Sequence, residues 1–153
     1  MLLGLLQVLM ITSIGIPGFS QSVFEFDYHF DVDNEREQYN AFMVRNDDGT
    51  GFMRVLYRDS AAHEWVLVDM EIQEHYFGDE DPNDKSKTDS SILVFEGFNP
   101  KVIKGPANLT YDPDIFLFQY NQETGDYEPL GVLSEDENNN EYEGVINEVT
   151  LLN

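Results

Sequence analysis

A short acidic segment, residues 79–90, has the spacing in this sequence that comes closest to a metal site. Asp79, Asp81 and Asn83 occupy the first, third and fifth positions of an EF-hand-like loop, and Asp84 follows at the sixth. Oxygen ligands at alternate positions suit Ca²⁺, but an EF-hand also needs glycine at position six and a bidentate glutamate at position twelve, where this chain has Ser90. Asp79, Asp81, Asn83 and Asp84 are therefore candidate ligands of an irregular calcium site. The alternative is a solvated acidic loop.

A second polar segment, "NDDGTG" at residues 46–51, could bind phosphate, bind calcium or form a turn. A phosphate-binding loop needs two glycines five positions apart, then lysine and a helix. Here the glycines are two apart and no lysine follows. Asp-Gly pairs tolerate the positive φ that tight hairpin turns require. The segment therefore predicts a β-hairpin in which Gly49 and Gly51 serve the turn.

Side chains for zinc binding or nucleophilic catalysis are sparse. The chain has no cysteine, and His29, His63 and His75 are too far apart in sequence to place two imidazoles on one element. There is no Gly-x-Ser-x-Gly elbow. A carboxylate pair could hydrolyse a glycoside, but with 30 acidic residues some pair will be close by chance. We therefore expect a non-enzymatic protein without a cofactor, calcium excepted.

The charge of the chain excludes some classes of partner. The formal net charge is −22, from 30 acidic and 8 basic residues. Nucleic-acid binding needs a basic surface that displaces counterions from phosphate, and an anionic membrane surface would repel this protein. Residues 105–153 contain eleven acidic residues and no Lys or Arg.

The first 20 residues read as a secretory signal. They are uncharged and apolar, Pro17-Gly18 interrupts the apolar run, and the small residues Gly18 and Ser20 suit a signal peptidase. An uncleaved membrane anchor is the alternative, which the Pro-Gly break disfavours. Without cysteines the chain forms no disulfides, which fits a bacterial periplasmic or extracellular protein. We expect export, cleavage before Gln21 and no stable membrane insertion afterwards.

The rest of the chain, residues 21–153, predicts a single β-domain. Short runs rich in aromatic and β-branched residues are bounded by Gly, Pro, Asn or Asp, and no sustained helical period appears. The fold class expected is all-β, an antiparallel sandwich or partly closed barrel of six to eight strands with little helix. The runs lie at 22–32, 38–45, 51–58, 64–73, 91–98, 114–120 and 143–152.

Three stretches carry a resemblance to a known group of proteins: "NDDGTGFMRVLY", "FNPKVIKGPA" and "YDPDIFLFQYNQETGDYEPLGV". Over residues 38–133 the chain resembles the non-catalytic β-region that follows the signal in large secreted bacterial proteins, some with a caspase-like peptidase further on. Those peptidases use a Cys–His pair, and this chain has no cysteine, so no catalytic residue carries over. The resemblance implies the front module of a longer polypeptide.

Two functions from different classes follow as hypotheses. The first is an exported interaction or positioning module whose partner is another protein or a downstream domain. The second is a lipocalin-like barrel that binds a small ligand or glycan at its mouth. Trp65, near Tyr57 and Tyr76 in sequence, could stack on a sugar ring, with a structural aromatic as the alternative. A calcium-binding module and a carboxylate-based hydrolase are less favoured.

Overall fold

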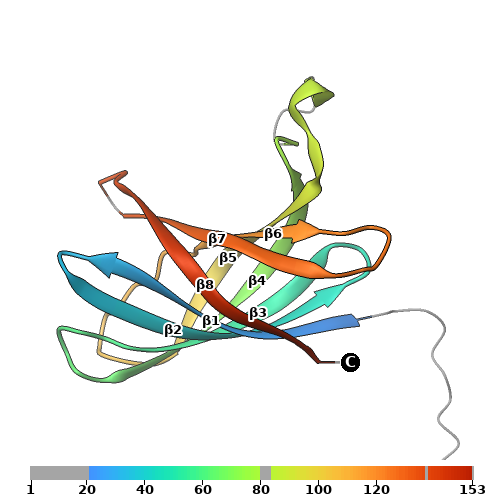
Figure 1. Ribbon diagram of the computed structural model, residues 1–153. Helices are drawn as coiled ribbons and strands as arrows, with labels where there is room; N and C mark the ends of the chain where they lie inside the picture. The colour runs from blue at the N-terminus through green and yellow to red at the C-terminus, as the bar shows by residue number, and fades with distance from the viewer. Residues whose placement is uncertain (1–20, 80–83, 137, 153) are drawn as a thin grey trace, which may run out of the picture.

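The protein folds into a closed antiparallel β-barrel. The computed structural model describes residues 21–79, 84–136 and 138–152. Within these residues eight strands follow one another along the chain (Figure 1): β1 (Gln21–Val32), β2 (Glu35–Asn46), β3 (Thr50–Arg58), β4 (Trp65–Phe77), β5 (Asp89–Lys104), β6 (Ile115–Tyr120), β7 (Tyr127–Glu135) and β8 (Glu141–Leu152).

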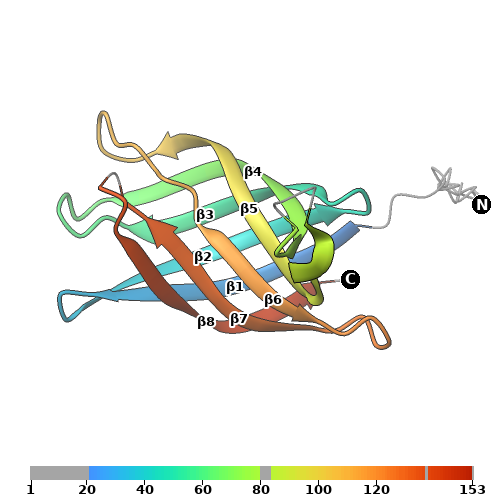
Figure 2. The same cartoon turned by 90° about the horizontal axis from the view of Figure 1, so that it is seen from above.

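Each strand pairs with its neighbours in sequence, and β1 closes the sheet by pairing with β8. Figure 2 shows β1 and β8 side by side, with the strands tilted across the barrel. The sequence prediction of an all-β fold with six to eight strands is confirmed, and of its two architectures the barrel is the one formed. Closure removes the free sheet edges that would otherwise invite pairing with other chains.

Alternation of side chains along each strand fills the barrel interior. On β1, Phe24, Phe26, Tyr28 and Phe30 all point inward and are buried. Their rings contact residues of the opposite wall; Phe26 lies 5.5 Å from Phe116 between ring centroids. Because the two faces of a strand alternate, one apolar face is enough to build a packed interior in a barrel of this size.

The segment at residues 46–51 is a hairpin turn, as predicted. Gly49 has φ +79°, and its backbone N–H donates to the Asn46 carbonyl over 3.0 Å. Gly51, in contrast, lies within β3 opposite Arg45, so its role differs from the one predicted. A side chain at Gly51 would overlap the Val44 carbonyl oxygen and the Ile72 side chain. Gly49 serves the turn, whereas Gly51 permits close packing of neighbouring strands.

The connections define two ends of the barrel. The β1–β2, β3–β4, β5–β6 and β7–β8 connections gather at the left end in Figure 1, which we call the mouth. The β2–β3, β4–β5 and β6–β7 connections lie at the opposite end. There β4 and β5 extend beyond the barrel as a projecting hairpin, which contains η1 (Lys85–Lys87), the one helical turn among the described residues.

Candidate functional site

A cavity of about 300 Å³ opens at the mouth of the barrel. Residues from the mouth-side ends of β1, β2, β3, β7 and β8 line it, together with the segment that leads into β6. The lining is aromatic and acidic: Phe30, Val32, Glu37, Tyr39, Tyr57, Thr110, Tyr111, Asp112, Asp114, Ser134, Glu135, Asp136 and Tyr142. A concave site in the mouth of a barrel, with aromatic walls and a few convergent polar groups, is typical of small-molecule binding.

Among the acidic residues that line this cavity, Asp114 is the buried one, with only 4% of its surface exposed. Asp114 stands just before β6, in phase with the inward-facing Phe116. Its Oδ2 accepts hydrogen bonds from the hydroxyl groups of Tyr28 and Tyr111, each over 2.9 Å. Burial raises the pKa of Asp114, and hydrogen bonds from Ser134, Tyr28 and Tyr111 oppose that shift. The protein thus holds a carboxylate in its interior by surrounding it with hydroxyl donors.

Three tyrosines form a curved wall beside Asp114. The ring centroids of Tyr39 and Tyr57 are 4.9 Å apart and those of Tyr57 and Tyr111 are 6.0 Å apart, with the ring planes tilted by 37° and 43°. Tyr28 supports the wall from below by stacking on Tyr39, with ring centroids 4.9 Å apart and planes 9° from parallel. Tyr28, Tyr39 and Tyr57 are directly paired residues of β1, β2 and β3, so their rings pack against one another along the sheet.

The cavity carries a negative potential. Its lining includes five carboxylates, and none of the described residues that line it is Lys, Arg or His. At the rim the Tyr39 hydroxyl donates to Glu37 over 2.9 Å, and the Tyr142 hydroxyl donates to Asp136 over 3.2 Å. Burial, together with the charges of Asp59, Glu37 and Asp114, raises the pKa of Tyr57 to about 12. Acidic neighbours and burial both oppose formation of a further negative charge here.

The other end of the barrel is closed by side chains. Arg45 on β2 and Glu74 on β4 form a part-buried ion pair across β3, and Arg45 Nη2 lies 2.9 Å from Glu74 Oε1. Gly51, which has no side chain, is the β3 residue paired with Arg45, so the two side chains can meet above it. The rings of Tyr120 and Tyr127, 4.9 Å apart between centroids, pack beside this end. The cavity therefore opens at the mouth.

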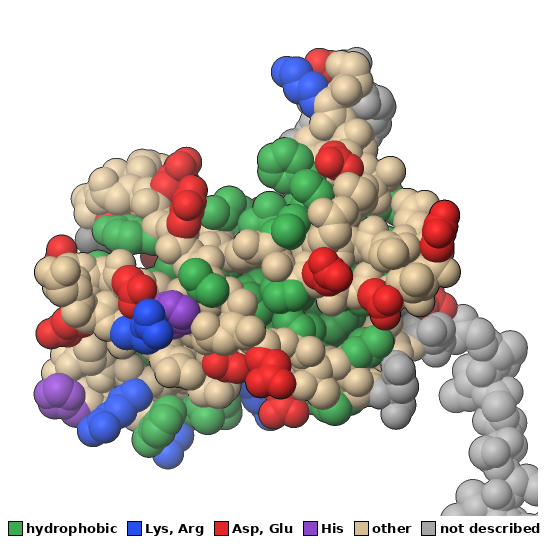
Figure 3. All heavy atoms as spheres, in the orientation of Figure 1, with side chains coloured by type: hydrophobic (Ala, Val, Ile, Leu, Met, Phe, Trp, Pro, Cys, Tyr) green, Lys and Arg blue, Asp and Glu red, His purple; other side chains and the backbone are tan. Residues whose placement is uncertain are grey.

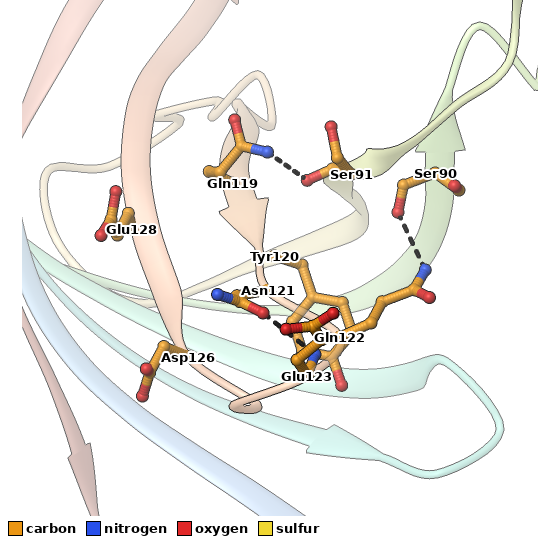
Figure 4. Close-up of a pocket in the computed structure, with 9 residues that line it drawn as sticks. All are labelled: Ser90, Ser91, Gln119, Tyr120, Asn121, Gln122, Glu123, Asp126 and Glu128. Atoms are coloured by element: carbon orange, nitrogen blue, oxygen red, sulfur yellow. Dashed lines mark hydrogen bonds between the residues drawn. The ribbon is translucent and has the colours of Figure 1, made fainter.

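Figure 4 shows a second depression, of about 500 Å³, on the outside of the barrel between the base of the projecting hairpin and the β6–β7 connection. Its amides are engaged locally: Gln119 donates to the Ser91 carbonyl over 3.1 Å and Gln122 to the Ser90 carbonyl over 3.4 Å. These bonds tie β6 and the β6–β7 connection to β5. We interpret this depression as a structural junction, because its amide groups are directed at backbone and not at the open space.

Of the four predicted calcium ligands, Asp81 and Asn83 lie outside the described residues. Asp79 and Asp84 lie on the two sides of the projecting hairpin, and Asp84 accepts hydrogen bonds from the backbone and hydroxyl of Ser86. Among the residues that the structure describes, no three or more His, Cys, Asp or Glu side chains are grouped so as to hold a metal ion. The calcium site stays a prediction.

The histidines and the tryptophan singled out in the sequence lie apart. His29 is buried on β1, His63 lies in the β3–β4 connection and His75 lies on β4. Trp65 begins β4, is 52% exposed and pairs with Arg58 on β3. Trp65 and Tyr76 are not among the residues that line the mouth cavity, whereas Tyr57 is.

Sequence reasoning missed the centre of the candidate site. Asp114 was included only as the first residue of an expected strand, and Tyr28 and Tyr111 were not identified as functional. One signal was available: Asp114 has the same two-residue phase as Phe116 and Phe118, so an acid falls on an otherwise apolar face. An acid on the buried face of a strand is informative because buried carboxylates need partners.

No protein-family model, curated protein or solved structure matches this chain. No helix within the described part of the chain is long and apolar enough to cross a bilayer. The case for function therefore depends on the geometry of the barrel itself.

Proposed function

We propose that this protein is an exported, non-enzymatic barrel that binds a small ligand in the mouth cavity. The observation that carries the proposal is the buried carboxylate of Asp114 beside an aromatic wall, in a cavity of about 300 Å³. This volume is at the lower end of the range for ligand pockets, roughly 300–1,000 Å³. A small organic molecule or one sugar ring fits that size.

Binding explains these groups better than catalysis does. The pKa values of Tyr28, Tyr39 and Tyr111 are all raised, with burial as the largest cause. A tyrosine that acts as a general base or nucleophile needs the opposite shift. The phenols instead donate hydrogen bonds to carboxylates, an arrangement that fixes the shape and polarity of a binding site.

The test is ligand-observed NMR with a set of small neutral, cationic and anionic fragments that includes monosaccharides. Val32 lies in the cavity lining with its side chain only half-buried, so Val32→Trp would fill the cavity. Leu130→Trp is the matched control because Leu130 is 53% exposed on β7 and is not a lining residue of the mouth cavity. We expect fragments to bind the wild type and the control but not Val32→Trp. Equal binding to all three proteins, or no binding to any, would overturn the proposal.

Export is the second part of the proposal, and it rests on the signal-like first 20 residues. Intact-mass measurement of the protein recovered from the periplasm of a bacterial host tests it. We expect a mass that corresponds to a chain beginning at or near Gln21. Recovery of the uncleaved chain in the membrane fraction would contradict this expectation.

An interaction module is the second candidate function, and the outer surface of the barrel favours it. Leu130 on β7 and Val145 on β8 are 53% and 55% exposed. Figure 3 shows exposed apolar side chains between carboxylates on the face that carries these strands. A reading frame that continues past codon 153 into a second domain, such as a caspase-like peptidase, would supply a partner to purify and titrate. Binding weakened by Val145→Glu and unaffected by Val32→Trp would support this candidate, and no binding would contradict it.

A further inference from the structure

We propose a second binding site on the outer wall of the barrel, where a neutral sugar ring lies against Trp65. The site is a depression of about 450 Å³ over the mouth-side ends of β2, β3 and β4 and the connection between β3 and β4. These three strands lie side by side in Figure 2. Among the described residues, Glu37 at the rim is the one that lines both this depression and the mouth cavity. The proposal therefore does not depend on binding in the mouth.

Trp65 is the residue on which the sugar would lie. It is the single tryptophan of the chain, and it is 52% exposed at the start of β4. None of the ring–ring and cation–π contacts among the described residues involves it. The indole thus has open surface on which the apolar C–H face of a sugar ring can rest. A single exposed apolar side chain is common on protein surfaces, so the polar groups around Trp65 decide what it can bind.

These polar groups can both donate and accept hydrogen bonds. Arg58 is paired with Trp65 across β3 and β4, and its Nε donates to the His63 carbonyl over 3.4 Å. The two Nη groups of Arg58 and the amide of Asn40 on β2 have no partner within the described part of the chain. A sugar hydroxyl has one proton to donate and two lone pairs that accept, so it suits surroundings that offer both.

The balance of charge in the depression favours a neutral ligand. Two guanidinium groups and three carboxylates line it, whereas five carboxylates and, among the described residues, no basic side chain line the mouth cavity. Several of these charges are already paired. Arg36 Nε donates to Asp31 over 2.9 Å, and Glu37 accepts hydrogen bonds from the hydroxyls of Tyr39 and Ser60. In these nearly balanced surroundings a polyol gains hydrogen bonds to charged groups, and a ligand needs no net charge to bind.

The connection that forms one wall of the depression is held in place by its own hydrogen bonds. The Asp59 carbonyl accepts from the backbone N–H of His63 over 3.0 Å, and the Asp59 carboxylate accepts from the N–H of Ala62. His63 has φ +56°, a conformation that a residue other than glycine keeps only where its surroundings fix it. A wall that is fixed before the ligand arrives reduces the entropy lost on binding.

The fluorescence of Trp65 tests the proposal directly, because the chain has no other tryptophan. The probes are the neutral trisaccharides cellotriose, mannotriose and galactotriose, the flexible polyol sorbitol, and the anion trigalacturonate. We expect at least one neutral trisaccharide to change the emission in a saturable titration, and sorbitol and trigalacturonate to cause no saturable change. No saturable response to any trisaccharide, or an equal response to sorbitol or trigalacturonate, would overturn the proposal.

Variants locate the bound sugar, with affinities measured by isothermal calorimetry. Trp65→Ala should weaken binding of the responding trisaccharide roughly tenfold or more. Phe77→Ala is the matched control, because Phe77 is 46% exposed at the other end of β4 and is not a lining residue of the depression. Equal affinities of these two variants would overturn the proposal.

The mouth variant Val32→Trp separates this site from the proposed function. It should leave the trisaccharide affinity unchanged, and circular dichroism shows whether each variant is folded. If Trp65→Ala does not fold, Val32→Trp decides: loss of trisaccharide binding would place the sugar in the mouth, which overturns this inference and supports the proposed function. Fragments that still bind Val32→Trp but not Trp65→Ala belong to the outer site and not to the mouth.

Discussion

The hydroxyl of Tyr28 lies 2.9 Å from Oδ2 of Asp114, and this hydrogen bond joins the middle of β1 to the entrance of β6 inside the barrel. An apolar residue in place of Asp114 would pack in the interior without the penalty of removing a charge from water. The carboxylate therefore works against stability. A titratable group that lowers stability, lies in a cavity and has a perturbed pKa with specific hydrogen-bond partners is a candidate functional residue.

We predict that Tyr28→Phe lowers the free energy of unfolding by about 1–3 kcal/mol, because it leaves a buried carboxylate with one donor fewer. Urea denaturation measures the change. Tyr142→Phe is the control, since it removes the same group from a hydrogen bond to Asp136 at the rim, where water can replace the donor. We expect a clearly smaller loss for the control, and equal losses would contradict the role assigned to Asp114.

The pH dependence of stability should change in Asp114→Asn. Burial raises the pKa of Asp114 in the folded state, so the folded protein holds this proton more tightly than the unfolded chain. The contribution of Asp114 to stability is then fully present below about pH 4, the unfolded-state value, and is lost as pH rises through the folded-state pKa. Asparagine does not titrate. The stability of the variant relative to the wild type should therefore increase as pH rises from about 3 to 7.

Urea midpoints of the two proteins across that pH range provide the measurement. Effects of the other carboxylates cancel in the difference between the proteins, because both contain them. A difference that stays constant, or that falls as pH rises, would show that the pKa of Asp114 is not raised in the folded state.

Much of the fold was predictable because strand formation follows local alternation, as the inward residues of β1 show. Closure of the barrel was not predictable, because the pairing of β1 with β8 depends on the overall twist and curvature of the sheet and not on any local sequence pattern. The sequence analysis named no strand over residues 127–135, where β7 lies. Pro129 and Gly131 weaken the strand signal there, and the register between β6 and β7 shifts between Leu117 and Phe118, opposite these residues.

The site was less predictable than the fold. Asp114 is one of 30 acidic residues, and its burial depends on Tyr28, which is 86 positions away in sequence. Tyr39 and Tyr57 meet as a cross-strand pair of the β2–β3 hairpin, whereas Tyr111 reaches them only through the tertiary fold. In contrast, the turn at Gly49 was predictable because the positive φ is a local requirement.

We predict that Gly49→Val lowers stability by roughly 1–3 kcal/mol, because a β-branched residue is strained at φ +79°. Calorimetric melting measures the effect. Gly131→Ala is the control, since an added Cβ there would meet only the Gly144 carbonyl oxygen at 3.4 Å. An unchanged melting temperature for Gly49→Val together with loss of a binding activity would instead assign this turn to a ligand.

The last prediction concerns the projecting hairpin of β4 and β5. Calcium binding and ordinary charge screening differ in how the stability of the protein depends on the identity of the cation. Asp84 already accepts hydrogen bonds from Ser86, and these lower its pKa without any metal. Lys87 Nζ lies 3.8 Å from Oδ2 of Asp84, the carboxylate oxygen that Ser86 does not contact. Such a group is satisfied locally, so we expect screening, in which ionic strength and not the identity of the cation sets the effect. At fixed ionic strength, millimolar calcium should then raise the melting temperature by little more than magnesium does. A large calcium-specific rise that disappears in an Asp79→Asn/Asp81→Asn variant would show instead that the hairpin binds calcium, because a ligand that binds only the folded state stabilises it.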